Sequence, residues 1–132
     1  MGYNTNYEGE LRFNKELSIQ ELNKLKTFLN EDCRDHPEWN REDLTHIDLE
    51  FLDDFSGLRY NGAEKSYQMT EKINLIINEM KKEFPDFELS GGFSAHDDYG
   101  EKWIIEIENN VAIEKEYKSI TKILIDKLRG GN

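Results

Sequence analysis

Apolar and polar residues alternate along this chain in blocks that follow two different periods. An alternation of period two predicts strands over 7–13, 47–51 and 58–60, each with one apolar and one polar face. Apolar residues that recur at helical spacing predict helices over 19–29 and 69–84. The first half of the chain therefore predicts a strand, a helix, a hairpin and a second helix.

Local signals define the boundaries of the first helix. Ser18 and Glu21 have the spacing of a capping box, so the helix should begin directly after Ser18. Pro37 disfavours helical backbone at His36, and we predict that 31–43 is a loop.

Three further strands are predicted in the last part of the chain. They cover 87–95, 103–107 and 111–117, and the pair Gly91-Gly92 predicts a bulge or bend in the first of them. Apolar residues between 120 and 128 predict a short C-terminal helix.

The order of these elements predicts the fold class. A β-α-β-β-α-β-β-β chain with alternating strands indicates an α+β fold, an antiparallel sheet with two helices on one face. The first six elements match a ferredoxin-like, or split β-α-β, core, to which the last strands add an extra hairpin. We expect one domain over 1–132, with a disordered tail at 129–132.

The charge is strongly negative and unevenly distributed. The chain has 17 basic and 28 acidic residues, a net charge of −11, which argues against direct binding to nucleic acid phosphates. Residues 31–54 hold ten of these acids and two bases, a local charge of −8. Such a segment is often only a solvated surface, but it can also attract a basic protein partner.

Cysteine content and hydropathy suggest a cytoplasmic protein. The lone Cys33 cannot form an intrachain disulfide, and the residues after Met1 lack the basic start and apolar run of a signal peptide. The apolar runs are far shorter than the roughly 20 residues that cross a bilayer.

The first functional hypothesis is a partner-binding surface around Trp39, an aromatic residue in an acidic loop. Aromatic anchors surrounded by charge are typical of protein interfaces, although Trp39 could instead fold back over the core. The candidate partner-binding residues are Asp35, Glu38, Trp39, Glu42, Asp43, Asp53 and Asp54.

The second hypothesis is a site for a small ligand or a signal nucleotide. Its candidate residues are Tyr60, Glu64, Lys65 and Trp103. We rank it second, because an anionic ligand needs more positive charge than Arg59, Lys65 and Lys102 supply.

A metal-dependent hydrolase is the third hypothesis. Its weak metal-ligand candidates are Asp53, Asp54, His96, Asp97 and Asp98, should the sheet bring the two double-aspartate turns together. The alternative is that these aspartates bond their local backbone, as is common in tight turns. Cys33 and His36 form only half of a zinc site, so we expect no metal or other cofactor and assign no catalytic residue.

A hydrolytic triad and nucleotide-binding loops receive no support from the sequence. Ser94, His96 and Asp97 are the residue types of a triad, but adjacent strand residues point to opposite faces. Neither a P-loop nor a G-x-G-x-x-G motif occurs.

Three stretches resemble a family of small accessory proteins encoded by tailed phages and prophages, for which no activity is established. They are the opening 1–7 with Gly9, the loop 32–39, and Asp53-Asp54-x-Ser56-Gly57 with the following 62–65. The resemblance spans roughly residues 2–107 and assigns no site residues.

This resemblance implies a phage accessory protein in the host cytoplasm. Small acidic phage proteins are similar, as a class, to inhibitors of host defence. The function expected is non-enzymatic binding and inhibition of a host defence protein, such as a nucleic-acid-binding effector with a basic surface. A homo-oligomer is a further expectation, because an edge strand at 111–117 could pair with another copy.

Overall fold

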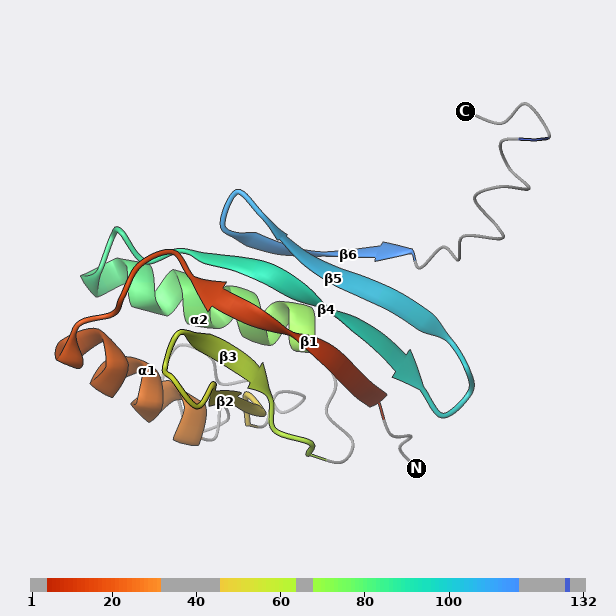
Figure 1. Ribbon diagram of the computed structural model, residues 1–132, viewed down its shortest axis with the longest axis horizontal. Helices are drawn as coiled ribbons and strands as arrows, with labels where there is room; N and C mark the ends of the chain where they lie inside the picture. Colours follow the sequence, from red (N-terminus) through yellow and green to blue (C-terminus); the bar gives the residue numbers. More distant parts are fainter. Residues whose placement is uncertain (1–4, 32–45, 64–67, 117–127, 129–132) are drawn as a thin grey trace.

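The computed structural model describes residues 5–31, 46–63 and 68–116, together with Leu128. The elements are β1 (Thr5–Phe13), α1 (Ile19–Asn30), β2 (Leu49–Phe51), β3 (Gly57–Tyr60), α2 (Met69–Glu83), β4 (Leu89–Asp97), β5 (Lys102–Glu108) and β6 (Val111–Glu116) (Figure 1). The predicted order β-α-β-β-α-β-β-β is confirmed. The predicted C-terminal helix, apart from Leu128, and the tail 129–132 lie outside the described residues.

The capping box at the start of α1 is confirmed. The Ser18 hydroxyl accepts a hydrogen bond from the Glu21 backbone N–H at 3.1 Å, and the Glu21 carboxylate accepts one from the Ser18 backbone N–H at 3.2 Å. These bonds satisfy two donors that a helix start otherwise leaves unpaired. The helix therefore begins at Ile19, as the sequence predicts.

The six strands form one antiparallel sheet in the order β2-β3-β1-β4-β5-β6. Its centre is the long pair β1 and β4, in which Thr5 lies opposite Asp97 and Phe13 opposite Leu89. The N-terminal end of β1 and the C-terminal end of β4 therefore meet at one end of the sheet. In Figure 1 this is the end near the N-terminus.

One face of the sheet carries the core and the other is open, as predicted. Inward side chains of the strands pack with apolar side chains of both helices, including Leu25 of α1 and Ile73 of α2. The alternate strand residues Glu8, Ser94 and His96 are exposed. Both helices cover the same face, because side chains of each belong to the single buried cluster.

The pairing of β1 with β4 runs without interruption through Gly91-Gly92, so the predicted bulge is absent there. Gly91 has a φ of 91°, and a Cβ at this position would lie 2.5 Å from the Glu10 carbonyl oxygen. Such a backbone is strained for other residues, and the approach of β1 leaves no room for a side chain. Glycine is thus required by the close contact of the two strands.

The last hairpin turns through two residues, Asn109 and Asn110, with φ values of 51° and 62°. Asparagine tolerates this left-handed conformation, which a two-residue hairpin of this type requires. The turn sets Val111 opposite Glu108 and places it on the open face, where it is 50% exposed. Ala112 instead faces the helices and is buried.

Part of the β6 edge is covered by α2. The Asn74 side chain donates to the Ala112 carbonyl at 3.0 Å and accepts from the Ala112 N–H at 2.8 Å. A strand edge with free backbone groups can pair with another chain. Asn74 prevents such pairing at Ala112.

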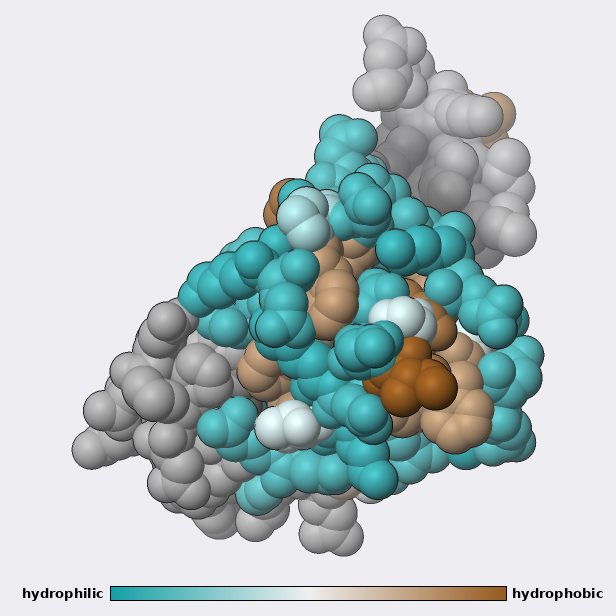
Figure 2. All heavy atoms as spheres, turned by 90° about the vertical axis from the view of Figure 1, so that its left-hand side faces the viewer, coloured by the Kyte–Doolittle hydropathy of each residue, from teal (hydrophilic) through white to brown (hydrophobic). Residues whose placement is uncertain are grey.

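The end of the molecule opposite Thr5 has a mostly hydrophilic surface, which Figure 2 shows broken by small apolar areas. Within the described residues, neither helix has the length and apolar character needed to span a membrane.

Candidate functional site

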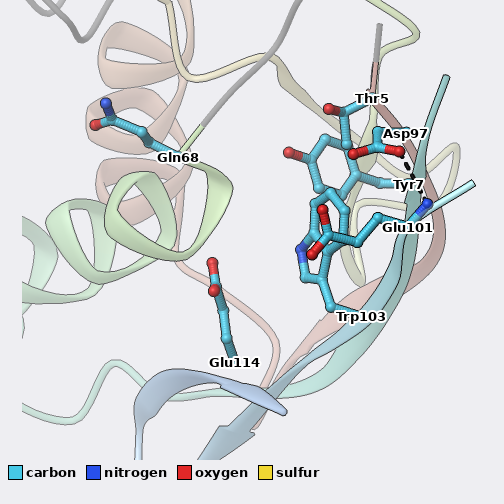
Figure 3. Close-up of a pocket in the computed structure, with 7 residues that line it drawn as sticks. All are labelled: Thr5, Tyr7, Gln68, Asp97, Glu101, Trp103 and Glu114. Atoms are coloured by element: carbon cyan, nitrogen blue, oxygen red, sulfur yellow. Dashed lines mark hydrogen bonds between the residues drawn. The ribbon is translucent and has the colours of Figure 1, made fainter. Parts of the chain in front are cut away.

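Four strand ends, those of β1, β4, β5 and β6, and the start of α2 surround a pocket of about 580 Å³ at the Thr5 end of the sheet. The antiparallel registers explain this convergence, because Thr5 pairs with Asp97, Ala95 with Trp103, and Trp103 with Glu116. The described lining residues are Thr5, Tyr7, Gln68, Asp97, Glu101, Trp103 and Glu114 (Figure 3).

Asp97 shapes the turn between β4 and β5 with only one of its carboxylate oxygens. Its Oδ1 accepts hydrogen bonds from the backbone N–H groups of Tyr99 and Glu101, at 2.9 and 3.0 Å. The residue is 7% exposed. Figure 3 shows Oδ1 bonded to the turn and the other oxygen on the pocket side. Within the described residues, Oδ2 has no hydrogen-bond donor.

Thr5 contributes a second side-chain oxygen to the same wall. The residue is 4% exposed, and its hydroxyl points toward the side of the pocket where the Tyr7 ring lies (Figure 3). Its backbone carbonyl accepts a hydrogen bond from the Tyr60 hydroxyl at 3.5 Å. The side-chain hydroxyl, in contrast, forms no hydrogen bond with any residue that the structure describes.

Glu101 and Trp103 line the pocket at the start of β5. In Figure 3 the Glu101 side chain overlaps the indole of Trp103 in the view, and both residues line the pocket. The indole nitrogen points toward α2. Across the described ranges, the Glu101 carboxylate has no ion-pair partner.

Glu114 approaches from β6 on the other side of the pocket. Its carboxylate accepts a hydrogen bond at 2.8 Å from the Thr70 hydroxyl in the first turn of α2. The positive end of a helix dipole stabilises a nearby carboxylate. The Glu114 carboxylate therefore has a hydrogen-bond donor on α2. Among the described residues, Asp97 Oδ2 and the Glu101 carboxylate have no such donor.

The pocket is acidic and partly aromatic. Its described lining includes three carboxylates and two aromatic side chains, but no lysine, arginine or histidine. Carboxylates attract cations, and aromatic faces attract them further through the ring quadrupole. The arrangement suits a cationic group and disfavours an anionic ligand.

Tyr60 packs against Tyr7, and their rings meet edge to face with centroids 5.0 Å apart. Burial, with a smaller contribution from the negative Asp48, raises the pKa of the Tyr60 hydroxyl. That hydroxyl donates to the Ala63 carbonyl. Tyr60 and Trp103, both predicted to bind a small ligand, thus lie at the same end of the sheet, separated by Tyr7.

The two double-aspartate turns lie at opposite ends of the sheet. Asp53 and Asp54 belong to the β2–β3 turn beside Phe13, whose N–H donates to the Ser56 carbonyl, whereas Asp97 lies opposite Thr5. The turns cannot share a metal ion. Within the described residues, no group of three or more His, Cys, Asp and Glu side chains is arranged to hold one.

The interpretation of these aspartates as turn residues is confirmed for Asp54 and Asp97. The Asp54 carboxylate accepts from the Ser56 hydroxyl at 2.6 Å and from the Ser56 N–H at 3.0 Å. These bonds, the hydroxyl first, lower the pKa of Asp54 from its ordinary value of 3.8. Asp53 is 95% exposed in its side chain and lies 3.4 Å from Arg59.

Ser94 and His96 point to the open face of the sheet, while Asp97 is buried on the helix face. This alternation is the geometry expected from adjacent strand residues, and it keeps a relay through His96 and Asp97 from forming.

Several residues singled out from the sequence lie outside the described residues. They are Asp35, Glu38, Trp39, Glu42, Asp43, Glu64 and Lys65, and also Cys33 and His36.

Five described pocket residues are not among the site residues predicted from sequence: Thr5, Tyr7, Gln68, Glu101 and Glu114. The signal that points to them is positional. In an antiparallel sheet, the start of one strand and the end of its neighbour meet, so polar residues at such ends are candidates for one site.

Comparison of the chain with protein-family models, with curated proteins and with solved structures found no match.

Proposed function

We propose that this protein is a non-enzymatic binding protein that docks on a basic protein surface. The observation that carries the proposal is the pocket at the Thr5 end of the sheet. There Asp97, Glu101 and Glu114 line one pocket, and no basic residue occurs among the described lining residues. Asp97 is buried, whereas Glu101 and Glu114 are exposed and accessible to a basic side chain of another protein.

The overall charge supports the same proposal. A net charge of −11 steers a positively charged partner toward the protein over distances comparable with the Debye length, about 8 Å at physiological salt. The segment 31–54 adds to this attraction with its −8 charge, and Trp39 remains its proposed anchor. Steering of this kind increases the association rate more than it slows dissociation.

The biological role we propose is inhibition of a host defence protein by a phage-encoded inhibitor in the host cytoplasm. It rests on the resemblance of the chain to phage accessory proteins. We also infer a ferredoxin-like core, because the first six elements follow the split β-α-β order. That core supports many unrelated functions, so the proposal depends on the site.

The experiment that tests the proposal measures association with a defined basic peptide. The immobilised peptide carries three arginines and three lysines among glycine and serine residues, and the protein is flowed over it at 50 and 500 mM NaCl. We expect the association rate to fall at least about tenfold at the higher salt concentration. Absence of binding, or a rate indifferent to salt, would contradict the proposal.

A matched pair of variants separates the pocket from the overall charge. Glu101→Gln with Glu114→Gln removes two charges at the pocket, and Glu8→Gln with Glu88→Gln removes two exposed charges elsewhere. We expect the pocket variant to weaken binding at least about tenfold and the control less than about twofold. Equal losses would show that only the net charge matters.

A small cationic molecule is the second candidate ligand. The pocket volume of about 580 Å³ falls in the range typical of small-molecule sites. The three carboxylates favour an amine over the signal nucleotide considered from sequence. Mass spectrometry of the purified protein would detect such a molecule if it copurifies.

A further inference from the structure

We infer that the pocket binds a guanidinium group, and that Asp97 Oδ2 and the Thr5 hydroxyl are its innermost acceptors. The inference rests on the proposed function and specifies the group that the basic partner inserts. It identifies that group as the end of an arginine side chain.

The Thr5 hydroxyl is the observation that distinguishes this pocket from an acidic patch. Thr5 is 4% exposed, and the side chain of such an enclosed residue normally has a hydrogen-bond partner. Thr5 has none for its hydroxyl among the described residues, and it lines the pocket. Its hydroxyl oxygen is not one of the fully buried unpaired side-chain atoms of the described residues, which are Glu21 Oε2 and Gln68 Oε1, so a ligand can reach it. A donor that enters the pocket would complete this bond.

Asp97 points to the same ligand by an independent route. Its Oδ1 accepts hydrogen bonds from two backbone N–H groups, and these bonds fix the orientation of the carboxylate in the turn. The second oxygen is directed to the pocket side from a residue that is 7% exposed (Figure 3). A carboxylate that is held in one orientation, with one oxygen still able to accept hydrogen bonds, is a suitable acceptor for a charged N–H donor.

The spacing of acceptors favours guanidinium over ammonium. Acceptors come from β1, from the end of β4 and from Glu101 before β5, so they surround the ligand from several directions. A guanidinium is planar and carries five N–H donors, whereas an ammonium is a compact point charge with three. Its flat face also stacks on aromatic rings, which Tyr7 and Trp103 supply.

The test uses nuclear magnetic resonance to follow titrations with N-acetyl-arginine methylamide and with its lysine counterpart. The Trp103 indole N–H signal reports on the pocket and is assigned with Trp103→Phe. We expect saturable shifts of this signal and of the Thr5 amide, with arginine binding at least about fivefold tighter than lysine. No shift, or equal affinity for both compounds, would overturn the inference.

Two variants test the innermost acceptors. Asp97→Asn keeps an oxygen for the turn but replaces Oδ2 with a donor, and we expect the Kd for the arginine compound to rise at least about tenfold. Thr5→Val removes only the hydroxyl, and we expect about a fivefold rise. Asp98→Asn, which removes an exposed charge in the same turn, is the control and should change the Kd less than about twofold. Unchanged Kd values in Asp97→Asn and Thr5→Val, with folded spectra, would overturn the inference.

The outcomes separate this inference from the proposed function. If the basic peptide binds wild type, Asp97→Asn and Thr5→Val equally, the basic-partner proposal stands and the guanidinium site is wrong. If the small arginine compound binds the pocket but no basic peptide binds, the site is right and its ligand is a free guanidino compound. If neither binds, both are wrong.

Discussion

The ion pair between Lys72 and Asp48 places two charges in the interior of the molecule. Their side chains are 2% and 12% exposed, and the Lys72 Nζ lies 2.9 Å from the Asp48 Oδ2. Removing one partner from such a pair leaves an uncompensated buried charge. Asp48 also has a φ of 65°, a left-handed conformation that asparagine tolerates as well as aspartate does.

Asp48→Asn should therefore lower the free energy of unfolding by about 3 kcal/mol, through loss of charge alone. Chemical denaturation measures this change. Asp53→Asn is the matched control, since Asp53 is 95% exposed, and should change stability by less than about 0.5 kcal/mol. Equal stabilities of the two variants would show that the buried pair contributes nothing.

The contact between Asp54 and Ser56 makes stability depend on pH in a defined window. Because the pKa of Asp54 is lowered in the folded protein, the contact contributes stability above the ordinary value of 3.8 and loses it as pH falls through the folded pKa. Ser56→Ala removes the hydroxyl, the largest cause, and should raise the pKa of Asp54 toward 3.8. Titration of the Asp54 carboxyl resonance measures the shift, and an unchanged midpoint would contradict this account.

At the scale of elements, the pairing of β1 with β4 depends on Gly91. Its positive φ and the nearby Glu10 carbonyl impose two separate restrictions, conformation and space. Gly100 has a similar φ of 83°, but no heavy atom lies within 4 Å of the position of a Cβ.

Comparing Gly91→Ala with Gly100→Ala isolates the cost of the close approach. Gly100→Ala should lose about 1 kcal/mol through backbone strain. Gly91→Ala should lose a further 1–3 kcal/mol, on the order expected for overpacking. Thermal or chemical unfolding of both variants measures the difference, and equal losses would mean that β1 moves away without penalty.

The elements were largely predictable from sequence because each carries a local signal. The capping box at Ser18 and the helical spacing of α2 are readable within a few residues. Which side chains of β6 face the helices is harder to predict. The two-residue turn at Asn109-Asn110 makes Val111 face away from them. The absence of a bulge at Gly91 depends on the neighbouring strand, which local sequence does not describe.

At the scale of the whole molecule, the structure changes the meaning of the charge distribution. Within the acidic segment 31–54, Asp48 pairs with Lys72, and Glu50 and Asp53 both contact Arg59. Partners from outside the segment thus neutralise part of its −8 charge. The pocket carboxylates instead come from 97–114, a separate stretch that holds six acidic residues and one basic residue.

The candidate site was only partly predictable from the sequence. Trp103 and Asp97 were recognised by residue type, but Thr5 and Glu114 are separated by more than a hundred positions. Only the strand order, with β1 beside β4 and β5 beside β6, brings them to one pocket. That order depends on long-range pairing rather than on a local motif.

The most direct test of the central claim is a map of the surface that a basic peptide contacts, obtained from amide shift changes in solution. We predict that the largest changes fall at Thr5 and Tyr7 and over 97–103, with smaller ones at Glu114. Changes confined to the opposite end, around Asp53 and Asp54, or no changes at all, would contradict the claim that the acidic pocket is the binding site.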